Sequence, residues 1–435
     1  MKGSGGWRWG DPWLWVEGSV LLLAAPFLLF PTQFYLGTCV TLLLLAGVWL
    51  WRCRHFPSTP FNLPLLLWSL ALIAGILVTA DPDLTLPKAT GLILGLGVWR
   101  FAARYITDER RLRWVGLAYL LLGLGFAALG AFSANWYTKV PFLRGVVALL
   151  PANLLQLPGS PDTGVQLNQL AGTLILLLPL LLSLSFAWPI KNRRDWLWRG
   201  GFLLLTLGLG VLLLLSQSRS GWLGMIAGIF TSLALWRGMA ETPAVRRRLT
   251  ALLAALLLGG LLLALSIGPA RWQQIIEEPP RETAIGTLGT IRFRLEVWQW
   301  AVAGIQDFPF TGTGLGSFRQ VVHRFYPINT PLSYDIAHAH NIFLQVALDL
   351  GLPGLVAYLA LLLLAGVIGW QAARRAPPLR PWAIGLLAGL VALHVYGLAD
   401  ALAPGSKPAL LFWLALGLLA GMSRLKPGFS EKPGS

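Results

Sequence analysis

Long apolar runs recur through nearly the whole chain and limit its possible folds more than any other feature. Twelve such segments can be drawn, at residues 13–31, 33–51, 62–79, 84–105, 112–132, 166–188, 200–216, 218–236, 249–268, 341–370, 381–400 and 408–423. A helix of about 20 apolar residues crosses the hydrocarbon core of a bilayer. Only 12% of the residues are charged, against roughly 25% in a soluble domain. We therefore expect an all-α, polytopic membrane protein with about twelve transmembrane helices.

The Lys and Arg residues predict how the chain is oriented. If the N-terminus is cytoplasmic, 23 of the 34 Lys and Arg residues fall on the cytoplasmic side, as the positive-inside rule requires. Because the number of spans is even, both termini then lie in the cytoplasm. Lys2 and Arg8 precede an apolar run that is longer than that of a signal peptide and lacks a small-residue cleavage site, so we expect an uncleaved first span.

The net charge of +16 does not indicate a nucleic-acid partner. Cationic inner loops anchor a membrane protein against anionic lipid, which accounts for most of this charge. No basic segment is interleaved with aromatic residues on a soluble module. We expect membrane lipids, and no nucleic acid, among the partners. Cys39, in the second span, and Cys53, in the first inner loop, indicate neither a disulfide nor a metal site.

Two predicted outer loops are long, one at residues 133–165 and one from about 269 to 341. Loops of this length inside a compact bundle usually carry function. The larger one contains an amphipathic stretch at 291–305, expected to be a helix on the outer face of the bundle, with a common face formed by Phe293, Val297, Trp300 and Ala301. The expected domains are spans one to nine at 1–268, a catalytic loop at 269–340, and spans ten to twelve with a cytoplasmic tail at 341–435.

Several arginines lie on the outer side, against the positive-inside trend. They are Arg219, in the tight turn between spans seven and eight, and Arg271, Arg281, Arg292, Arg294, Arg319 and Arg324 in the large loop. Surface charges often contribute little, and Arg292 and Arg294 have Glu296 or the Glu277-Glu278 pair as available partners. An arginine at a membrane-embedded turn is costly unless it faces a cavity or a partner. Because guanidinium groups bind phosphate oxygens in two-point contacts, Arg219 favours a substrate that carries phosphate.

His338 and His340 lie two residues apart, just before Asn341 and the apolar run at 341–370. Asn341 is expected to cap that helix, because its amide oxygen can accept hydrogen bonds from the first helical turn. A histidine fixed beside the cap suits a general base. A metal is not expected, since no third ligand stands at ligand spacing. The other histidines are interpreted as structural or surface residues, with His394 and Asp400 as one conceivable buried polar pair.

The segment 312–317 is rich in glycine, but it follows no strand and its sixth residue is Ser317. It therefore does not match a dinucleotide-binding fingerprint. After Pro309 we expect a tight turn, whose backbone amides would at most assist in binding an anion.

Three elements of the chain together resemble the O-antigen ligase and O-antigen polymerase family of bacterial membrane glycosyltransferases. They are residues 218–222, then 294–298 with 307–309 and 312–316, and finally 338–341 with Leu344, Gly351 and Gly354. The resemblance covers about residues 200–370, and beyond them only the pattern of spans. It implies a fold of about twelve helices with a large helical periplasmic loop between spans nine and ten. It also implies a place in the bacterial inner membrane, with the active site on the periplasmic side.

The activity implied by the resemblance is a glycan transfer of the GT-C type that needs no cofactor and no metal. The donor would be a glycan linked to undecaprenyl diphosphate, and the acceptor a hydroxyl on a lipid or glycan such as the lipid A core. The family's catalytic positions would fall on His340, Arg219 and Arg294, with His338 and Arg292 as near-duplicates. His340 would take the proton of the acceptor hydroxyl as the anomeric carbon inverts, and the arginines would bind the pyrophosphate.

Other functions stay open at this point. A ligase, a polysaccharide polymerase and a protein O-oligosaccharyltransferase differ in acceptor, and one fold hosts all three. A small-anion transporter, for example of bicarbonate, would need ionisable groups near the bilayer midplane, for which His394 and Asp400 are the available residues. Peptidoglycan polymerisation would need an acidic catalytic residue in the large loop, where Asp307 and Asp335 stand.

Overall fold

The computed structural model describes residues 12–51, 57–151, 154–156, 165–188, 190, 192–268, 289–328 and 336–425. Within this part of the chain all regular structure is helical, which confirms the expected all-α class. Twelve helices coincide with the twelve apolar segments: α1 (Pro12–Leu29), α2 (Tyr35–Trp51), α3 (Asn62–Leu77), α4 (Pro82–Tyr105), α5 (Glu109–Ser133), α7 (Leu167–Ala187), α8 (Arg193–Leu215), α9 (Arg219–Gly238), α10 (Pro243–Ile267), α14 (Ile342–Arg375), α15 (Arg380–Tyr396) and α16 (Leu410–Arg424).

Among the described residues, six helical segments are long and apolar enough to cross a membrane by themselves. They are α5, α7, α8, α10 as far as Ser266, α14, and the segment Pro377–Tyr396 that contains α15. Shorter apolar helices follow the same pattern at Leu14–Leu29, Tyr35–Leu50 and Asn62–Leu77. The structure thus supports a membrane protein, and the count of about twelve spans stays a prediction.

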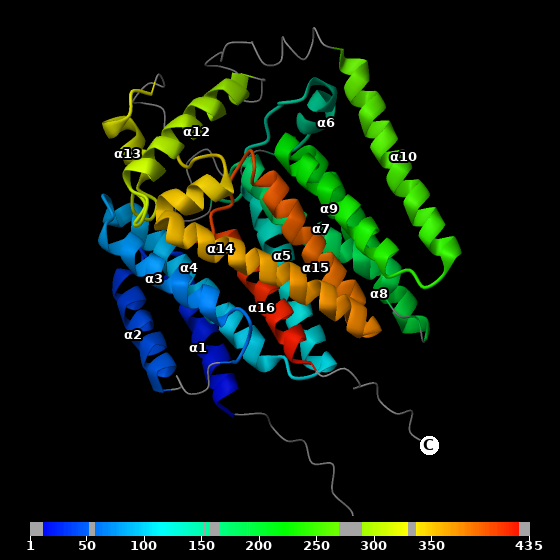
Figure 1. The fold of residues 1–435 in the computed structure, drawn as a ribbon, viewed down its shortest axis with the longest axis horizontal. Helices are drawn as coiled ribbons and strands as arrows, with labels where there is room; N and C mark the ends of the chain where they lie inside the picture. Colours follow the sequence, from blue (N-terminus) through cyan, green and yellow to red (C-terminus); the bar gives the residue numbers. More distant parts are fainter. Residues whose placement is uncertain are drawn as a thin grey trace, which may run out of the picture.

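The centre of the bundle is formed by α7, which packs against α5, α8, α9 and α15. Beside it, α16 packs against α4 and α14 packs against α3, so helices from both ends of the sequence share one core. The apolar helix α10 packs against α9 at the edge of the bundle (Figure 1). Its apolar residues are largely exposed, as expected for a surface in contact with lipid.

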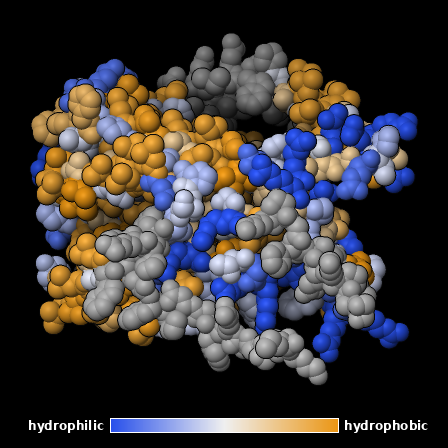
Figure 2. Space-filling model, turned by 60° about the horizontal axis from the view of Figure 1, so that its bottom comes forward, coloured by the Kyte–Doolittle hydropathy of each residue, from blue (hydrophilic) through white to orange (hydrophobic). Residues whose placement is uncertain are grey.

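One face of the bundle carries the basic helix ends. Exposed Arg193 and Arg194 begin α8, Arg237 lies in the last turn of α9, and Arg246 lies in the first turns of α10. Turned so that the bottom of Figure 1 comes forward, the surface shows hydrophilic residues bordered by hydrophobic ones (Figure 2). This arrangement is what the positive-inside orientation predicts for the cytoplasmic face.

The large loop contains two described helices, α12 (Gly289–Asp307) and α13 (Phe318–Phe325). Both lie at the end of the bundle opposite the start of α1 and the end of α16 (Figure 1). The amphipathic helix expected at 291–305 is confirmed, because Val297 and Ala301 are fully buried in a small core that Phe293 and Trp300 also contact. Arg271, Arg281, the Glu277-Glu278 pair and Asp335 lie outside the described residues, and so does the side chain of Arg292. The three-domain division stays a prediction.

Helix α14 is broken at Gly351, where φ is 68° and ψ is 179°. The glycine-rich turn fills this break: the N–H of Thr313 donates to the carbonyl of Leu348 at 2.7 Å, and the N–H of Leu352 donates to that of Pro309 at 2.7 Å. A Cβ atom on Gly351 would lie 2.3 Å from the carbonyl oxygen of Phe310, so the close approach requires glycine. The expected tight turn is therefore present, and it docks the large loop onto α14.

Candidate active site at the start of helix α14

The segment that precedes α14 is anchored on both sides. As expected, the side chain of Asn341 caps the helix, accepting hydrogen bonds from the N–H groups of Phe343 at 3.0 Å and Leu344 at 3.1 Å. Its amide nitrogen donates to the carbonyl of Leu398 at 3.2 Å, so the cap is also tied to the end of α15. His340 takes a left-handed conformation with φ of 49°, which is uncommon for a residue other than glycine. Strained backbone of this kind is frequent at active sites.

The two predicted histidines meet a carboxylate that the sequence did not assign to the site. The rings of His338 and His340 lie 4.3 Å apart between centroids. Asp400 Oδ1 lies 3.8 Å from Nε2 of His338 and 4.0 Å from Nδ1 of His340. The alternative pairing of Asp400 with His394 is wrong. His394 instead makes a hydrogen bond of 2.8 Å with the hydroxyl of Tyr358 inside the bundle.

Hydrogen bonding distinguishes the two histidines. The backbone N–H of His340 donates to Nδ1 of His338 at 3.1 Å. A ring nitrogen that accepts a hydrogen bond carries no proton, so neutral His338 holds its proton on Nε2, toward Asp400. Within the described residues, Nδ1 of His340 has Asp400 as its nearest carboxylate and makes no hydrogen bond. A proton on Nδ1 of His340 would face Asp400 and would leave Nε2 as an acceptor.

Arg219 is the first residue of α9, directly after a buried turn that holds the smaller outer loop. Ser218 caps the helix, and Gln217 takes a left-handed φ of 53°. The Gln217 side-chain oxygen accepts from the N–H groups of Lys139 at 2.7 Å and Val140 at 2.8 Å. Its amide donates to the carbonyl of Tyr137 at 2.9 Å. The turn that carries Arg219 therefore also fixes the backbone of Lys139.

A polar chain runs from this loop to the histidines. The Lys139 ammonium donates to Oδ1 of Asn168 at 3.4 Å, and Nδ2 of Asn168 donates to Oδ2 of Asp400 at 2.7 Å. Burial lowers the pKa of Lys139 to about 8; Asp400 opposes this shift, and the charges of Arg219 and Arg294 add to it. The charges of Arg219 and Arg294, from two other segments, thus both act on Lys139, which is linked to Asp400 through Asn168. Lys139, Asn168 and Asp400 are the site residues that sequence reasoning missed.

Comparison with known families supports the resemblance found in the sequence. Residues 203–359, a little more than a third of the chain, match the family model described as O-antigen ligase. These residues are therefore similar to the O-antigen ligase family. No curated protein matches the chain. The match contains Arg219, Arg294 and both histidines, whereas Lys139, Asn168 and Asp400 lie outside it. The match supports glycosyl transfer of the ligase or polymerase kind in general.

Both histidines of the matched segment have a lowered pKa, which favours the neutral ring. Burial lowers the pKa of His338 to about 3, with added repulsion from Lys88, Arg294 and Arg319. Burial also lowers the pKa of His340 to about 3; His338 and Arg294 add to the shift and Asp400 opposes it. A neutral imidazole is the form that can accept a proton. Either imidazole could therefore accept a proton well below the ordinary histidine pKa.

The same three side chains resemble a metal-binding group, since the ligand atoms of His338, His340 and Asp400 lie within 4.8 Å of one another. Two imidazoles and a carboxylate are a donor set that Zn²⁺ accepts. The hydrogen bond from the His340 N–H to Nδ1 of His338 opposes this use, because it puts the ring proton on the nitrogen that faces Asp400. A ligating nitrogen needs a free lone pair, so His338 would have to reorient before it could bind a metal.

Proposed function

We propose that the protein transfers a glycan from an undecaprenyl diphosphate-linked donor to an acceptor hydroxyl, on the outer face of the bacterial inner membrane. The observation that carries the proposal is the position of Asp400 Oδ1, 4.0 Å from Nδ1 of His340 and near Lys139, on which the charges of Arg219 and Arg294 act. A neutral base near a group of cations suits a reaction that deprotonates an alcohol and releases a diphosphate. The match of residues 203–359 to the O-antigen ligase family supports glycosyl transfer.

In the proposed reaction Nε2 of His340 accepts the proton of the acceptor hydroxyl. The hydroxyl oxygen attacks the anomeric carbon of the donor sugar from the face opposite the carrier, so the configuration inverts. The bond from that carbon to the phosphate oxygen breaks, and its electron pair leaves with the diphosphate. Asp400 stabilises the imidazolium as it forms. We assign the base role to His340 because the Nδ1 of His338 is already occupied as an acceptor.

The charge that develops on the diphosphate is stabilised by the protein's own cations. Arg219 and Arg294 each offer a planar fork of donors that matches phosphate oxygens. Lys139, whose backbone is held by Gln217, adds a point charge from the smaller loop. Donors already in place as charge develops contribute roughly a hundredfold or more in rate for each contact. These three cations can offset a diphosphate, and we therefore propose a metal-independent transfer of the GT-C type.

We also propose twelve membrane spans, with both termini cytoplasmic and the site on the periplasmic side. The agreement of twelve helices with twelve apolar segments supports this topology, as do the basic ends of α8, α9 and α10. Since α12 and α13 lie at the opposite end of the bundle (Figure 1), the large loop would then be outside. The carrier lipid would approach from the bilayer, with its diphosphate at the membrane surface.

The acceptor separates three versions of this function. A ligase would use the lipid A core, a polymerase a second lipid-linked glycan, and an oligosaccharyltransferase a protein hydroxyl. The ligase version is our proposal, because the matched family model is that of O-antigen ligase. The transporter alternative relied on His394 and Asp400 as a buried pair, whereas His394 makes its hydrogen bond with Tyr358 and the break in α14 is filled by the glycine-rich turn.

The experiment is a transfer assay with the full chain in nanodiscs, using an undecaprenyl diphosphate-linked glycan and each of the three acceptors in turn. We expect a glycan-bearing lipid A core product and stoichiometric release of undecaprenyl diphosphate. Product on a second lipid-linked glycan or on protein alone would replace the ligase by the polymerase or the oligosaccharyltransferase. Absence of product on every acceptor, from a protein that binds the donor, would contradict the proposed function.

A further inference from the structure

Two polar side chains are buried in the otherwise apolar first half of α14, between Asn341 and the break at Gly351. Gln345 is 1% exposed and Asp349 is 3% exposed. They stand one helical turn apart on the same face, and Nε2 of Gln345 donates to Oδ1 of Asp349 at 2.9 Å. Burying a polar group costs free energy unless it is hydrogen-bonded, so both side chains need further hydrogen-bond partners.

Each member of the pair holds a different segment of backbone. Oε1 of Gln345 accepts the N–H of Ala339 at 2.8 Å, which is the peptide between the two histidines. Oδ1 of Asp349 accepts the N–H of Gly316 at 2.8 Å, in the glycine-rich turn of the large loop. The two hydrogen bonds therefore connect the docked loop, through α14, to the histidine segment.

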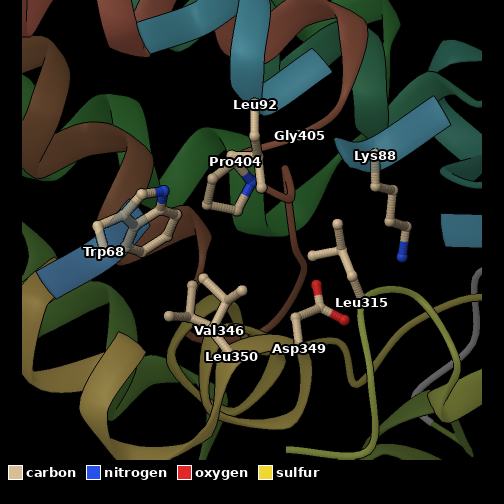
Figure 3. A pocket seen from close by; sticks show the side chains of 9 residues that line it. All are labelled: Trp68, Lys88, Leu92, Leu315, Val346, Asp349, Leu350, Pro404 and Gly405. Carbon is tan, nitrogen blue, oxygen red and sulfur yellow. The ribbon is translucent and has the colours of Figure 1, made fainter. Parts of the chain in front are cut away.

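The carboxylate of Asp349 also borders a small pocket, which Lys88 of α4 lines from another side (Figure 3). Leu315, in the glycine-rich turn, lies between the two charged side chains in this view. The Asp349 carboxylate accepts both N–H donors through the same oxygen, Oδ1. The hydrogen bonds of Asp349 Oδ1 thus go to Gln345 and to the Gly316 N–H, and not to the Lys88 ammonium.

We propose that Gln345 and Asp349 are positioning residues that hold His340 in its left-handed conformation, with its ring toward Asp400. The inference rests on the proposed function, because it assigns the pair to the orientation of the base. Asp349 fixes the amide of Gln345 so that the oxygen, and not the nitrogen, faces the Ala339 N–H. A strained residue persists only where its surroundings determine it, and this hydrogen bond acts on the residue directly before His340.

Three variants separate positioning from packing. Gln345→Leu keeps the approximate volume but removes the acceptor, so kcat should fall roughly a hundredfold while the donor KM changes little, as expected for a misplaced catalytic group. Gln345→Glu keeps the acceptor but sets a second carboxylate against Asp349. Two carboxylates so close must share a proton, so activity should be retained at low pH and lost as the pH rises. Adding Asp349→Asn to that variant removes the repulsion and should restore activity at high pH.

Val346→Ala is the matched control, since Val346 is equally buried on the same helix turn and makes no side-chain hydrogen bond. It should lower the thermal stability about as much as Gln345→Leu, and it should leave the pH profile unchanged. Equal pH profiles for Val346→Ala and Gln345→Glu would overturn the positioning role.

A readout without turnover separates this inference from the proposed function. Diethyl pyrocarbonate acylates neutral imidazoles, and mass spectrometry gives the rate at His340 in each variant. In the wild type that rate should stay flat between pH 7.5 and about 5, since Asp400, Arg294 and His338 surround a ring that remains neutral. In Gln345→Leu the rate should rise several-fold at pH 7.5 and fall as the pH drops through the ordinary histidine range.

Unchanged labelling of His340 in Gln345→Leu would overturn the positioning inference, whatever the transfer assay shows. Altered labelling combined with full glycan transfer by His340→Ala would leave the positioning intact and overturn the proposed function instead.

Discussion

The Nδ1 atom of His340 lies 4.0 Å from Oδ1 of Asp400, although α14 and α15 separate the two residues along the chain. Asp400 is almost fully buried and accepts hydrogen bonds from its neighbour Ala401 at 2.9 Å and from Asn168 at 2.7 Å. A carboxylate held in this way can fix the tautomer and the orientation of an imidazole. Asp400 is therefore the carboxylate that we propose to orient His340, the proposed base.

Replacing this carboxylate by an amide tests the partnership. Asp400→Asn keeps the size and one acceptor but removes the negative charge that stabilises the imidazolium. We expect kcat to fall by about a hundredfold or more, as in other enzymes whose base loses its carboxylate. Asp307→Asn is the control, because Asp307 accepts a hydrogen bond from Tyr326 at an exposed position. Equal loss in the two variants, measured in the transfer assay, would speak against a special role for Asp400.

The pH dependence of transfer should differ from that of an ordinary histidine. The sequence alone predicts a loss of activity as the pH falls through about 6.5. Because the pKa of His340 is lowered to about 3, the acid limb of kcat/KM should lie well below that value. A bound diphosphate compensates the charge of Arg294, so the acid limb of kcat should lie higher than that of kcat/KM. An acid limb of kcat/KM at 6.5 would contradict the buried, cation-flanked environment.

The same shift links stability to pH. Unfolded histidine binds a proton near 6.5, whereas the folded His338 and His340 stay neutral. Their contribution to the free energy of unfolding is therefore fully present above about pH 6.5 and is lost as the pH falls below it.

Donor affinity should depend on pH through Lys139. With a pKa of about 8, Lys139 loses its charge as the pH rises, so donor affinity should weaken on the alkaline side. Lys139→Ala should remove that alkaline loss of affinity.

Charge and shape can be separated at the proposed diphosphate clamp. Arg219→Lys and Arg294→Lys keep a cation but lose the planar fork, so both should be impaired, with the Ala variants worse. Donor affinity in nanodiscs should follow the same order, with the wild type tightest. The titration is repeated with a chelator, and we expect no change. Unchanged donor affinity in both Ala variants would exclude the clamp, and loss of activity on chelation would reveal a metal.

Topology can be read from thiol labelling in intact cells, in a background without Cys39 and Cys53. Phe325 is 66% exposed at the end of α13 and suits a cysteine, whereas Ser317 is fully buried and bonded to Thr79. We expect an impermeant reagent to label Phe325→Cys and to leave Arg247→Cys unlabelled until the cells are opened. The reverse pattern would invert the proposed orientation.

Much of the architecture is readable from local patterns in the sequence. Apolar runs predict all twelve long helices, because helices that face lipid need continuous apolar stretches. The Asn341 cap and the α12 face at Val297 and Ala301 are local as well. The break in α14 is not readable in this way, since Gly351 interrupts an apolar run that is otherwise continuous. Only its fit against the glycine-rich turn reveals the break.

The candidate active site could be predicted only in part, because some of its residues come together only through tertiary contacts. His338, His340, Arg219 and Arg294 stand out as polar residues at helix ends or in the large loop. Asp400 and Asn168 lie at the ends of apolar spans, where polar residues often serve only as caps. Lys139 resembles an ordinary loop cation until Gln217 is seen to hold its backbone. These residues join the site through tertiary contacts between distant segments, which no spacing rule detects.

Comparing His340→Ala with His338→Ala tests the central claim most directly. Both proteins are reconstituted in nanodiscs, checked for donor binding, and assayed for single-turnover transfer of glycan to the acceptor. We predict that His340→Ala binds the donor normally and loses transfer by about a hundredfold to ten-thousandfold, as expected for loss of a general base. His338→Ala should retain much more activity, because its ring only supports the site. Full transfer by His340→Ala, with loss in His338→Ala, would contradict the assignment.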